Sequence, residues 1–184
     1  ARRQRQMCIR DRMYPDGNPL IRISSGELGT KFEGATRPGH FDGVLAVVNK
    51  FFNIIRPAAG NHPVNAYFGQ KDAQQYILIQ RMVRDFNHDV IMRPVAIVRE
   101  DNGLALSSRN SYLSDEERES ALVLSRTLAL LRENSLNRGF HEIDLDGARE
   151  RINSTPGVRL DYLELVDPMT FGEPTEESER VLAL

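Results

Sequence analysis

Residues 41–98 alternate between helix-like and strand-like segments, and this alternation constrains the fold more than any other feature of the chain. Apolar residues recur at steps of three and four along two segments, which predicts two amphipathic helices. Short runs of β-branched and aromatic residues follow each of them. The helices are expected over 41–55 and 72–86, and the strands over 64–68, 89–92 and 95–98. The order helix, strand, helix, strand predicts parallel strands joined by crossover helices, and therefore an α/β sheet.

The spacing of apolar side chains also predicts which face of each helix is buried. For the first helix the expected inner residues are Val44, Val47, Val48, Phe51, Phe52 and Ile55. For the second helix they are Tyr76, Ile79, Met82, Val83 and Phe86. Pro57 is expected to end the first helix, and the strand over 64–68 is expected to be buried and to end at Gly69.

Outside residues 41–98 the sequence pattern changes. Before residue 41 it predicts less regular structure, and after about residue 98 it predicts a different fold class. LIRI (20–23) predicts a short strand between the turn MYPDGNP (13–19) and a glycine-rich polar loop that ends at RPGH (37–40). Further along, a long helix is expected over 114–135, opened by a capping box of Ser114 and Glu117, then a shorter helix near 144–153 and a strand over 158–166. This change predicts a second, smaller α+β domain with a boundary near 97–110.

The composition is that of an ordinary soluble globular protein. The 184 residues carry 24 Lys and Arg against 26 Asp and Glu, with 7% aromatic residues, which argues against a nucleic-acid surface. No apolar run approaches the roughly 18 residues of a membrane span. The single cysteine, Cys8, fits a reducing compartment, so we expect a cytoplasmic protein.

The first twelve residues differ from the rest, because ARRQRQMCIRDR holds five arginines and one aspartate. This segment could be a disordered basic arm, or a nucleic-acid or targeting tail. QRQMCIRDR also looks like translated sequencing-adaptor sequence. We favour this third interpretation and exclude residues 1–12 from the fold argument.

FGQKDAQQY (68–76) is the most informative stretch for function, because a strand that ends at Gly69 leads into a helix. Ligands gather at the carboxyl ends of strands in open α/β sheets, and a helix N-terminus suits a phosphate. Lys71, one of three lysines against 21 arginines, could reach such a phosphate. The alternative, favoured by spacing alone, is a capping box of Asp72 and Gln75 with Lys71 as a surface residue. The spacing of a Walker A loop is absent.

Two other stretches offer candidate side chains. In NGLALSSRNSYLS (102–114), the groups of Ser107, Ser108 and Arg109 could donate hydrogen bonds to a polyphosphate. A polar interdomain loop with local turns is an equally good interpretation. In RPGHF, His40 is either catalytic or a capping or surface residue. The remaining histidines are scattered and no G-x-S-x-G elbow occurs, so we expect neither a protein-built metal site nor Ser-His-Asp catalysis.

Taken together, the motifs resemble the pantothenate synthetase (pantoate–β-alanine ligase) family. They run in order through MYPDG, EGATRPGHFDGVLAVVNKFFNIIRP, FGQKDAQQYILIQRMVRDFN, VAIVREDNGLALSSRNSYLS and DYLELVDP, and they cover most of residues 13–168. The resemblance implies a partial Rossmann-like, nucleotidylyltransferase-type domain over 13–97 and an α+β lid domain over 98–184. It also implies ATP with Mg²⁺, pantoate and β-alanine as substrates, a homodimer in the intact enzyme, and neither nucleic-acid nor membrane partners.

The resemblance also implies roles for individual residues. The implied ATP-binding residues are Gly69, Gln70, Lys71, Asp72, Val98, Leu106, Ser107, Ser108 and Arg109. Among them, Lys71 and the Ser107–Arg109 group would stabilise charge on the phosphates. Gln75 would bind pantoate, and His40 would lie in a gate loop at the periphery of the site. A non-catalytic nucleotide-binding or dimerisation module and a related adenylate-forming enzyme with another acid are the alternatives.

The chain also departs from the family pattern. The family's His-x-Gly-His motif, its proton-donor histidine and a second pantoate-binding Gln are absent from this sequence, and AAGNHPVNAYF is a few residues longer than usual. The sequence stops at VLAL, where the family continues. We therefore expect a fragment that is inactive alone, with an exposed sheet edge and exposed apolar helix faces.

Overall fold

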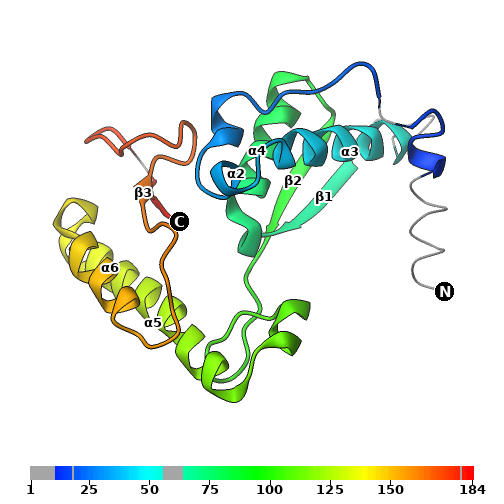
Figure 1. Cartoon of the computed structure of the whole chain (residues 1–184). Coiled ribbons are helices and arrows are strands. Elements are labelled where there is room, and N and C mark those ends of the chain that lie inside the picture. The colour runs from blue at the N-terminus through cyan, green and yellow to red at the C-terminus, as the bar shows by residue number, and fades with distance from the viewer. Residues whose placement is uncertain (1–10, 18, 56–63, 179) are drawn as a thin grey trace. The chain divides into compact units, whose positions relative to one another are not determined.

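The computed structural model describes residues 11–17, 19–55, 64–178 and 180–184, so Pro57 and most of the segment 1–12 lie outside the described residues. The chain forms two compact units, unit 1 (Ala1–Val95) and unit 2 (Ala96–Leu184) (Figure 1). The described elements of unit 1 are η1 (Glu27–Thr30), α2 (Glu33–Thr36), α3 (His40–Ile55), β1 (Val64–Gly69), η2 (Gln70–Asp72), α4 (Ala73–Asp85) and β2 (Val90–Val95). Those of unit 2 are η3 (Ser108–Tyr112), α5 (Asp115–Arg138), η4 (Phe140–Glu142), α6 (Leu145–Asn153), β3 (Leu165–Val166) and β4 (Leu182–Ala183).

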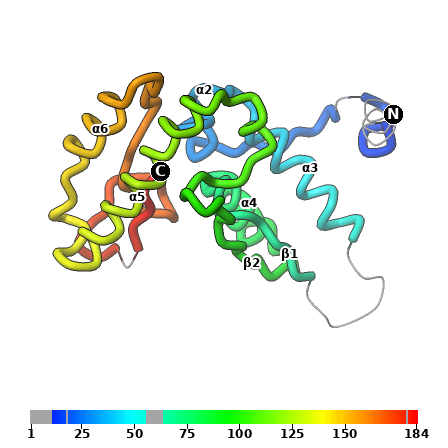
Figure 2. The backbone as a smooth tube through the Cα atoms, turned by 90° about the horizontal axis from the view of Figure 1, so that it is seen from below, coloured from blue at the N-terminus to red at the C-terminus, as the bar shows by residue number. Residues whose placement is uncertain are grey.

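The sheet of unit 1 pairs β1 with β2 in parallel, and α4 is the crossover between them (Figures 1 and 2). This confirms the predicted α/β order. The two short strands predicted around Pro94 are one strand, since Pro94 lies inside β2 opposite Phe68 and residues 96–98 belong to no strand. Proline lacks an N–H and is tolerated on a strand whose outer side has no partner. β2 is such a strand within the described part of the sheet.

Within the part of the chain that the structure describes, the strands are covered on one face only, so the expectation of a buried strand over 64–68 is wrong. Ala66 is buried, whereas Tyr67 and its cross-strand neighbour Arg93 are exposed on the opposite face. Arg93 Nε donates to Asn65 Oδ1 at 3.0 Å on that face. Within the residues that the structure describes, the core of unit 1 therefore lies between the sheet and its helices.

The predicted helices are confirmed, but their buried stripes are shifted. α3 packs against α4. The buried side chains of the two helices are Phe41, Leu45, Val48 and Phe52 of α3 and Gln74, Leu78, Ile79 and Met82 of α4. Phe51 and Ile55, expected inside, are exposed, and so is Phe86. α3 is apolar around more than one stripe, and the buried one carries Phe41, Leu45, Val48 and Phe52.

The segment before α3 contains short helices and no strand at residues 20–23. Leu20 is fully exposed and Ile21 is 91% exposed, and no neighbouring strand pairs with them among the described residues. The segment is attached by side chains instead. Ser25 donates from its backbone N and its Oγ to Asp42 Oδ1, at 2.7 and 2.6 Å. These bonds hold the pKa of Asp42 below its usual value.

Unit 2 is built on α5 and α6, which pack against each other around Leu131, Ala148, Ile152 and Leu163. The predicted capping box is confirmed: Glu117 N donates to Ser114 Oγ at 3.2 Å, and Ser114 N donates to Glu117 Oε2 at 2.8 Å. This is an α+β arrangement, because β3 and β4 form an antiparallel pair.

The strand predicted over 158–166 is only the two residues of β3. The backbone before β3 bonds to side chains of α6 in place of a neighbouring strand. Asn153 Oδ1 accepts from Leu160 N at 3.1 Å, and Arg149 donates from Nε and Nη2 to Leu163 O at 3.1 and 2.9 Å. Within the described residues, no helix is both long and apolar enough to cross a membrane.

Candidate functional site

The turn Gln70–Asp72 joins the carboxyl end of β1 to the start of α4. Lys71 Nζ lies 3.6 Å from Asp72 Oδ1, and the two side chains are 38% and 63% exposed. Asp72 occupies the N-cap position of α4, but its side chain makes no capping hydrogen bond. The capping-box interpretation of Asp72 with Gln75 is therefore wrong. The turn places an accessible ammonium group beside a helix N-terminus, an arrangement that suits a phosphate.

The first turn of α4 also anchors the segment that precedes α3. Gln74 is only 5% exposed, and its Nε2 donates to the carbonyl oxygens of Leu28 and Lys31 at 3.0 and 2.9 Å. Its Oε1 is buried without a hydrogen-bond partner. Gln75, the candidate pantoate ligand, is the next residue and is partly buried. One helical turn thus carries both an anchor and a candidate ligand.

His40 begins α3 and lies close enough to the Gln70–Asp72 turn for the charge of Asp72 to act on it. Burial lowers the pKa of His40 below its usual value, and the Arg37 guanidinium lowers it further, while Glu33 and Asp72 act in the opposite direction. The net effect of these groups favours the neutral imidazole over the charged one. The RPGH loop and the QKD turn, which are far apart in the sequence, both belong to unit 1.

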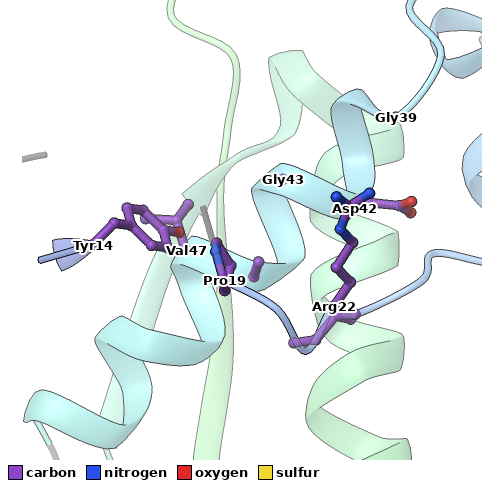
Figure 3. A pocket seen from close by; sticks show the side chains of 9 residues that line it. Tyr14, Pro19, Arg22, Gly39, Asp42, Gly43 and Val47 are labelled. Atoms are coloured by element: carbon purple, nitrogen blue, oxygen red, sulfur yellow. The ribbon is translucent and has the colours of Figure 1, made fainter. Parts of the chain in front are cut away.

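A cavity of about 560 Å³ opens beside the first half of α3 (Figure 3). It is lined by Tyr14, Pro19, Arg22, Ile23, Gly39, Asp42, Gly43, Ala46 and Val47. In Figure 3, Tyr14 and Val47 lie toward one end, and Arg22 and Asp42 toward the other. The lining includes none of the residues that the sequence assigned to ATP or pantoate. Val47, expected in the core, is one of the residues that line it.

The remaining candidate residues gather in one loop of unit 2. Leu106 N donates to Val98 O at 2.9 Å, so the chain forms a narrow hairpin between these residues. Ser107 then caps η3, and its Oγ accepts from Arg109 N at 3.2 Å. Ser108 and Arg109 are exposed. The loop therefore forms the local turns that are expected of a polar loop, and it also presents the side chains of Ser108 and Arg109 to solvent.

The candidate residues therefore form two groups, one in each unit. Unit 1 holds Gly69, Gln70, Lys71, Asp72 and Gln75, and unit 2 holds Val98, Leu106, Ser107, Ser108 and Arg109. Each group is assembled by contacts inside its own unit. Among the described residues there is no group of three or more His, Cys, Asp and Glu side chains that could hold a metal ion.

Comparisons with known proteins identify the family. A sequence model described as pantoate-beta-alanine ligase matches residues 8–184. The chain belongs to the pantoate–β-alanine ligase family. It is 51% identical over 174 residues to pantothenate synthetase of Paenarthrobacter aurescens, an alignment that covers 91% of this chain and 58% of the relative. It is 50% identical over 166 residues to that of Corynebacterium glutamicum, covering 90% and 56%. The chain thus spans a little over half the length of these pantoate–β-alanine ligase relatives.

Solved structures of the family have the same fold. A pantothenate synthetase from Thermus thermophilus matches with a TM-score of 0.76 and 40% identity, covering 92% of this chain and 63% of that one. A pantoate-β-alanine ligase from Francisella tularensis, complexed with beta-gamma ATP and β-alanine, matches with a TM-score of 0.63 and 35% identity, covering 84% and 53%. The predicted α/β, nucleotidylyltransferase-like fold class is confirmed.

Sequence reasoning missed Gln74, the Ser25–Asp42 contact and an ion pair of Arg118 with Glu100 in this member of the pantoate–β-alanine ligase family. The predicted stripe of the second helix does not include Gln74 or Leu78, four residues apart, which the structure buries together with Ile79 and Met82. A polar residue on an apolar stripe is buried only when it has a hydrogen-bond partner. The partners of Gln74 are backbone carbonyls, which no side-chain pattern reveals.

Proposed function

We propose that this chain carries ATP- and pantoate-binding groups of an enzyme that condenses pantoate with β-alanine to pantothenate. The reaction is proposed to run through pantoyl adenylate. A pantoate carboxylate oxygen attacks the α-phosphorus of ATP and pyrophosphate leaves. The β-alanine amine then attacks the acyl carbon, loses a proton and expels AMP. A carboxylate is already a nucleophile, so the first step depends on alignment and on stabilising charge on the phosphates.

The observation that carries the proposal is the turn at the carboxyl end of β1. Lys71 is accessible there beside the start of α4, and Asp72 is not used as a helix cap. In the proposed site the Lys71 ammonium balances negative charge on the ATP phosphates, and Asp72 faces the ribose. Gln75, one turn into α4, orients the pantoate through its neutral amide without repelling the acid.

The loop of unit 2 supplies the second group of the proposed site. Val98 offers its backbone to adenine, while Ser107, Ser108 and Arg109 donate hydrogen bonds to the phosphates. We assign Mg²⁺ to ATP itself, as part of the substrate, as the resemblance to the family implies. His40, whose pKa is lowered by burial and by Arg37, belongs to the proposed gate loop.

Pantoate-dependent exchange of pyrophosphate into ATP tests the proposal, with ATP binding measured by calorimetry as a readout that needs no turnover. We expect Lys71→Ala to lower exchange roughly 10²-fold or more, as for loss of one group that stabilises transition-state charge. Where exchange is absent, the same variant should weaken ATP binding. Lys50→Ala is the matched control, since Lys50 lies over the Tyr14 ring, 4.7 Å from its centroid, and has no role in the proposed site.

Each outcome decides one part of the proposal. Equal exchange or binding by the parent chain and the Lys71→Ala variant contradicts the role of Lys71. Exchange that depends on another acid contradicts pantoate as the substrate. ATP binding without exchange supports the nucleotide-binding groups and contradicts adenylate formation by this chain alone, whereas robust exchange supports both. If the chain shows neither ATP binding nor exchange, the proposed function of this chain is wrong.

A further inference from the structure

Arg118, in the first turns of α5, makes three hydrogen bonds to groups on both sides of the Ser107–Arg109 loop. Its Nη2 donates to both carboxylate oxygens of Glu100 at 2.8 Å. Its Nη1 donates to the backbone oxygen of Asn110 at 3.2 Å. Arg118 therefore ties the chain before the loop and the chain after it to one helix.

The two partners of Arg118 are themselves held by the hairpin. Glu100 N donates to Leu104 O at 2.8 Å, which fixes the segment that follows Val98. Asn110 Nδ2 donates to Ala105 O at 3.0 Å across the loop. Together with the bonds of Arg118, these hydrogen bonds link the residues on both sides of the Ser107–Arg109 turn to one another, and all of them lie within unit 2. The position of the loop is consequently set by few groups.

The setting of this ion pair differs from that of an ordinary surface pair. The side chains of Arg118 and Glu100 are 31% and 27% exposed, against 60% and 68% for Arg126 and Glu119 on the same helix. A cation near a helix N-terminus is disfavoured by the helix dipole, so Arg118 gains nothing from its place in α5. Its stabilising contribution comes from its contacts with Glu100 and Asn110.

We infer that Arg118 and Glu100 are positioning residues for ATP: they hold the Val98–Leu106 hairpin and the Ser107–Arg109 turn as one rigid piece. This inference rests on the proposed function. Neither residue touches the nucleotide in this scheme. They act through the backbone that carries Ser108 and Arg109, so their loss should weaken ATP binding and leave pantoate binding unchanged.

The test uses three variants of the full chain. Arg118→Met keeps much of the side-chain volume and removes the charge and the donors. Glu100→Gln is milder and still accepts a hydrogen bond, which keeps the test valid if Arg118→Met unfolds. Arg126→Met removes the exposed pair on the same helix and is the matched control. Hydrogen exchange of the amides of Leu106 and Asn110, which are both hydrogen-bonded, reports on the loop without ATP.

We expect Arg118→Met to raise exchange of these two amides about tenfold or more, since the bonds that hold a segment govern how often it opens locally. The KM for ATP in pyrophosphate exchange, or the Kd for ATP where exchange is absent, should rise about tenfold, as for loss of one hydrogen-bonded charge pair. Glu100→Gln should cause smaller changes of the same kind. Amides of the α5–α6 core, the KM for pantoate and the Arg126→Met variant should remain unchanged.

The outcomes separate this inference from the proposed function. Unchanged exchange of the Leu106 and Asn110 amides overturns the inference whether or not the chain binds ATP. A loosened loop with unchanged ATP affinity overturns the positioning role and leaves the proposed function standing. Equal losses for ATP and pantoate point to general destabilisation and also overturn it. If the parent chain neither binds nor turns over ATP, the proposed function fails and the positioning role fails with it.

Discussion

Replacing Gln74 with glutamate should destabilise unit 1 strongly at neutral pH and much less in acid. The amide of Gln74 donates to two carbonyl oxygens, those of Leu28 and Lys31, at 3.0 and 2.9 Å. A carboxylate in the same place has no donor and would face two oxygens. A protonated carboxyl donates once, so it keeps one of the two bonds and loses the other. The introduced group must therefore stay protonated for unit 1 to remain folded.

The magnitude follows from the burial of this position. Gln74 is 5% exposed, and a buried acid without donors has its pKa raised by about 3 units or more. At about 1.36 kcal/mol per unit, keeping it protonated from an ordinary pKa of about 4.3 up to pH 7 costs about 3.7 kcal/mol. The lost hydrogen bond adds about 1 kcal/mol. We therefore expect a loss of about 5 kcal/mol at pH 7, which is comparable to the whole stability of a marginal domain.

The pH dependence has a definite sign. The introduced carboxyl has a higher pKa in the folded state than in the unfolded state. Its contribution to the free energy of unfolding is therefore fully present below the unfolded pKa and is lost as the pH rises through the folded pKa. The difference in the free energy of unfolding between Gln74→Glu and the parent chain should thus shrink to about 1 kcal/mol near pH 4. Urea unfolding followed by far-ultraviolet circular dichroism at both pH values measures it.

The control is Gln80→Glu, the same chemical change at an exposed position of α4. It should alter the free energy of unfolding by less than about 0.5 kcal/mol at either pH. If Gln74→Glu and Gln80→Glu are equally stable at pH 7, the contacts of Gln74 with the two carbonyls do not stabilise unit 1. If the gap between them does not narrow in acid, the buried carboxyl is not the cause of the loss.

Three further predictions follow from single contacts. Ile79→Ala should lower the free energy of urea unfolding by about 2–5 kcal/mol because Ile79 is fully buried. Ile54→Ala on the exposed side of α3 should change it by less than about 0.5 kcal/mol. Equal effects of the two substitutions would contradict the burial of Ile79 in the core of unit 1. Ser114→Ala removes half of the capping box and should destabilise α5 by about 1 kcal/mol. This loss should be measurable as faster hydrogen exchange of the backbone amides in the first turns of α5. Unchanged exchange there would show that the cap does not stabilise the helix. Ser25 holds the pKa of Asp42 below its ordinary value of 3.8, so the stability that this contact adds is present above that pH and is lost as the pH falls through the lowered pKa. In paired urea titrations, Ser25→Ala should therefore be less stable than the parent chain at pH 6 and equally stable in strong acid. A difference that persists in strong acid would assign the effect to something other than the ionised carboxylate.

The sequence predicts the parts of this fold that depend on local pattern. Apolar spacing predicts α3, α4 and α5, and the Ser114–Glu117 pair predicts where α5 begins, because a capping box is encoded within four residues. The parallel order of β1 and β2 follows from the helix between them. The fold class is predicted for the same reason.

Features that depend on distant partners are missed. LIRI has strand-like composition but no neighbouring strand to pair with among the described residues, and residues 158–163 bond to Asn153 and Arg149 of α6 in place of a strand. The buried stripe of α3 is set by where α4 lies against it. For the candidate site, sequence motifs single out the Lys71 turn and the Ser107–Arg109 loop. The Arg118–Glu100 contact that braces the loop joins residues 18 apart and has no local signature.

The crossover from β1 to β2 has matched lengths, and this restricts how the chain can change through insertion and deletion. α4 has 13 residues, which at 1.5 Å each is about 20 Å, and β1 has six, which at 3.3 Å each is also about 20 Å. The helix therefore leads the chain from the end of β1 back to the level at which β1 begins, so that β2 starts with Val90 opposite Val64. One added residue in α4 would either turn its apolar stripe by about 100° or shift β2 by one position, which exchanges the two faces of the strand. Length variation among relatives should accordingly gather in loops and avoid β1, α4 and β2.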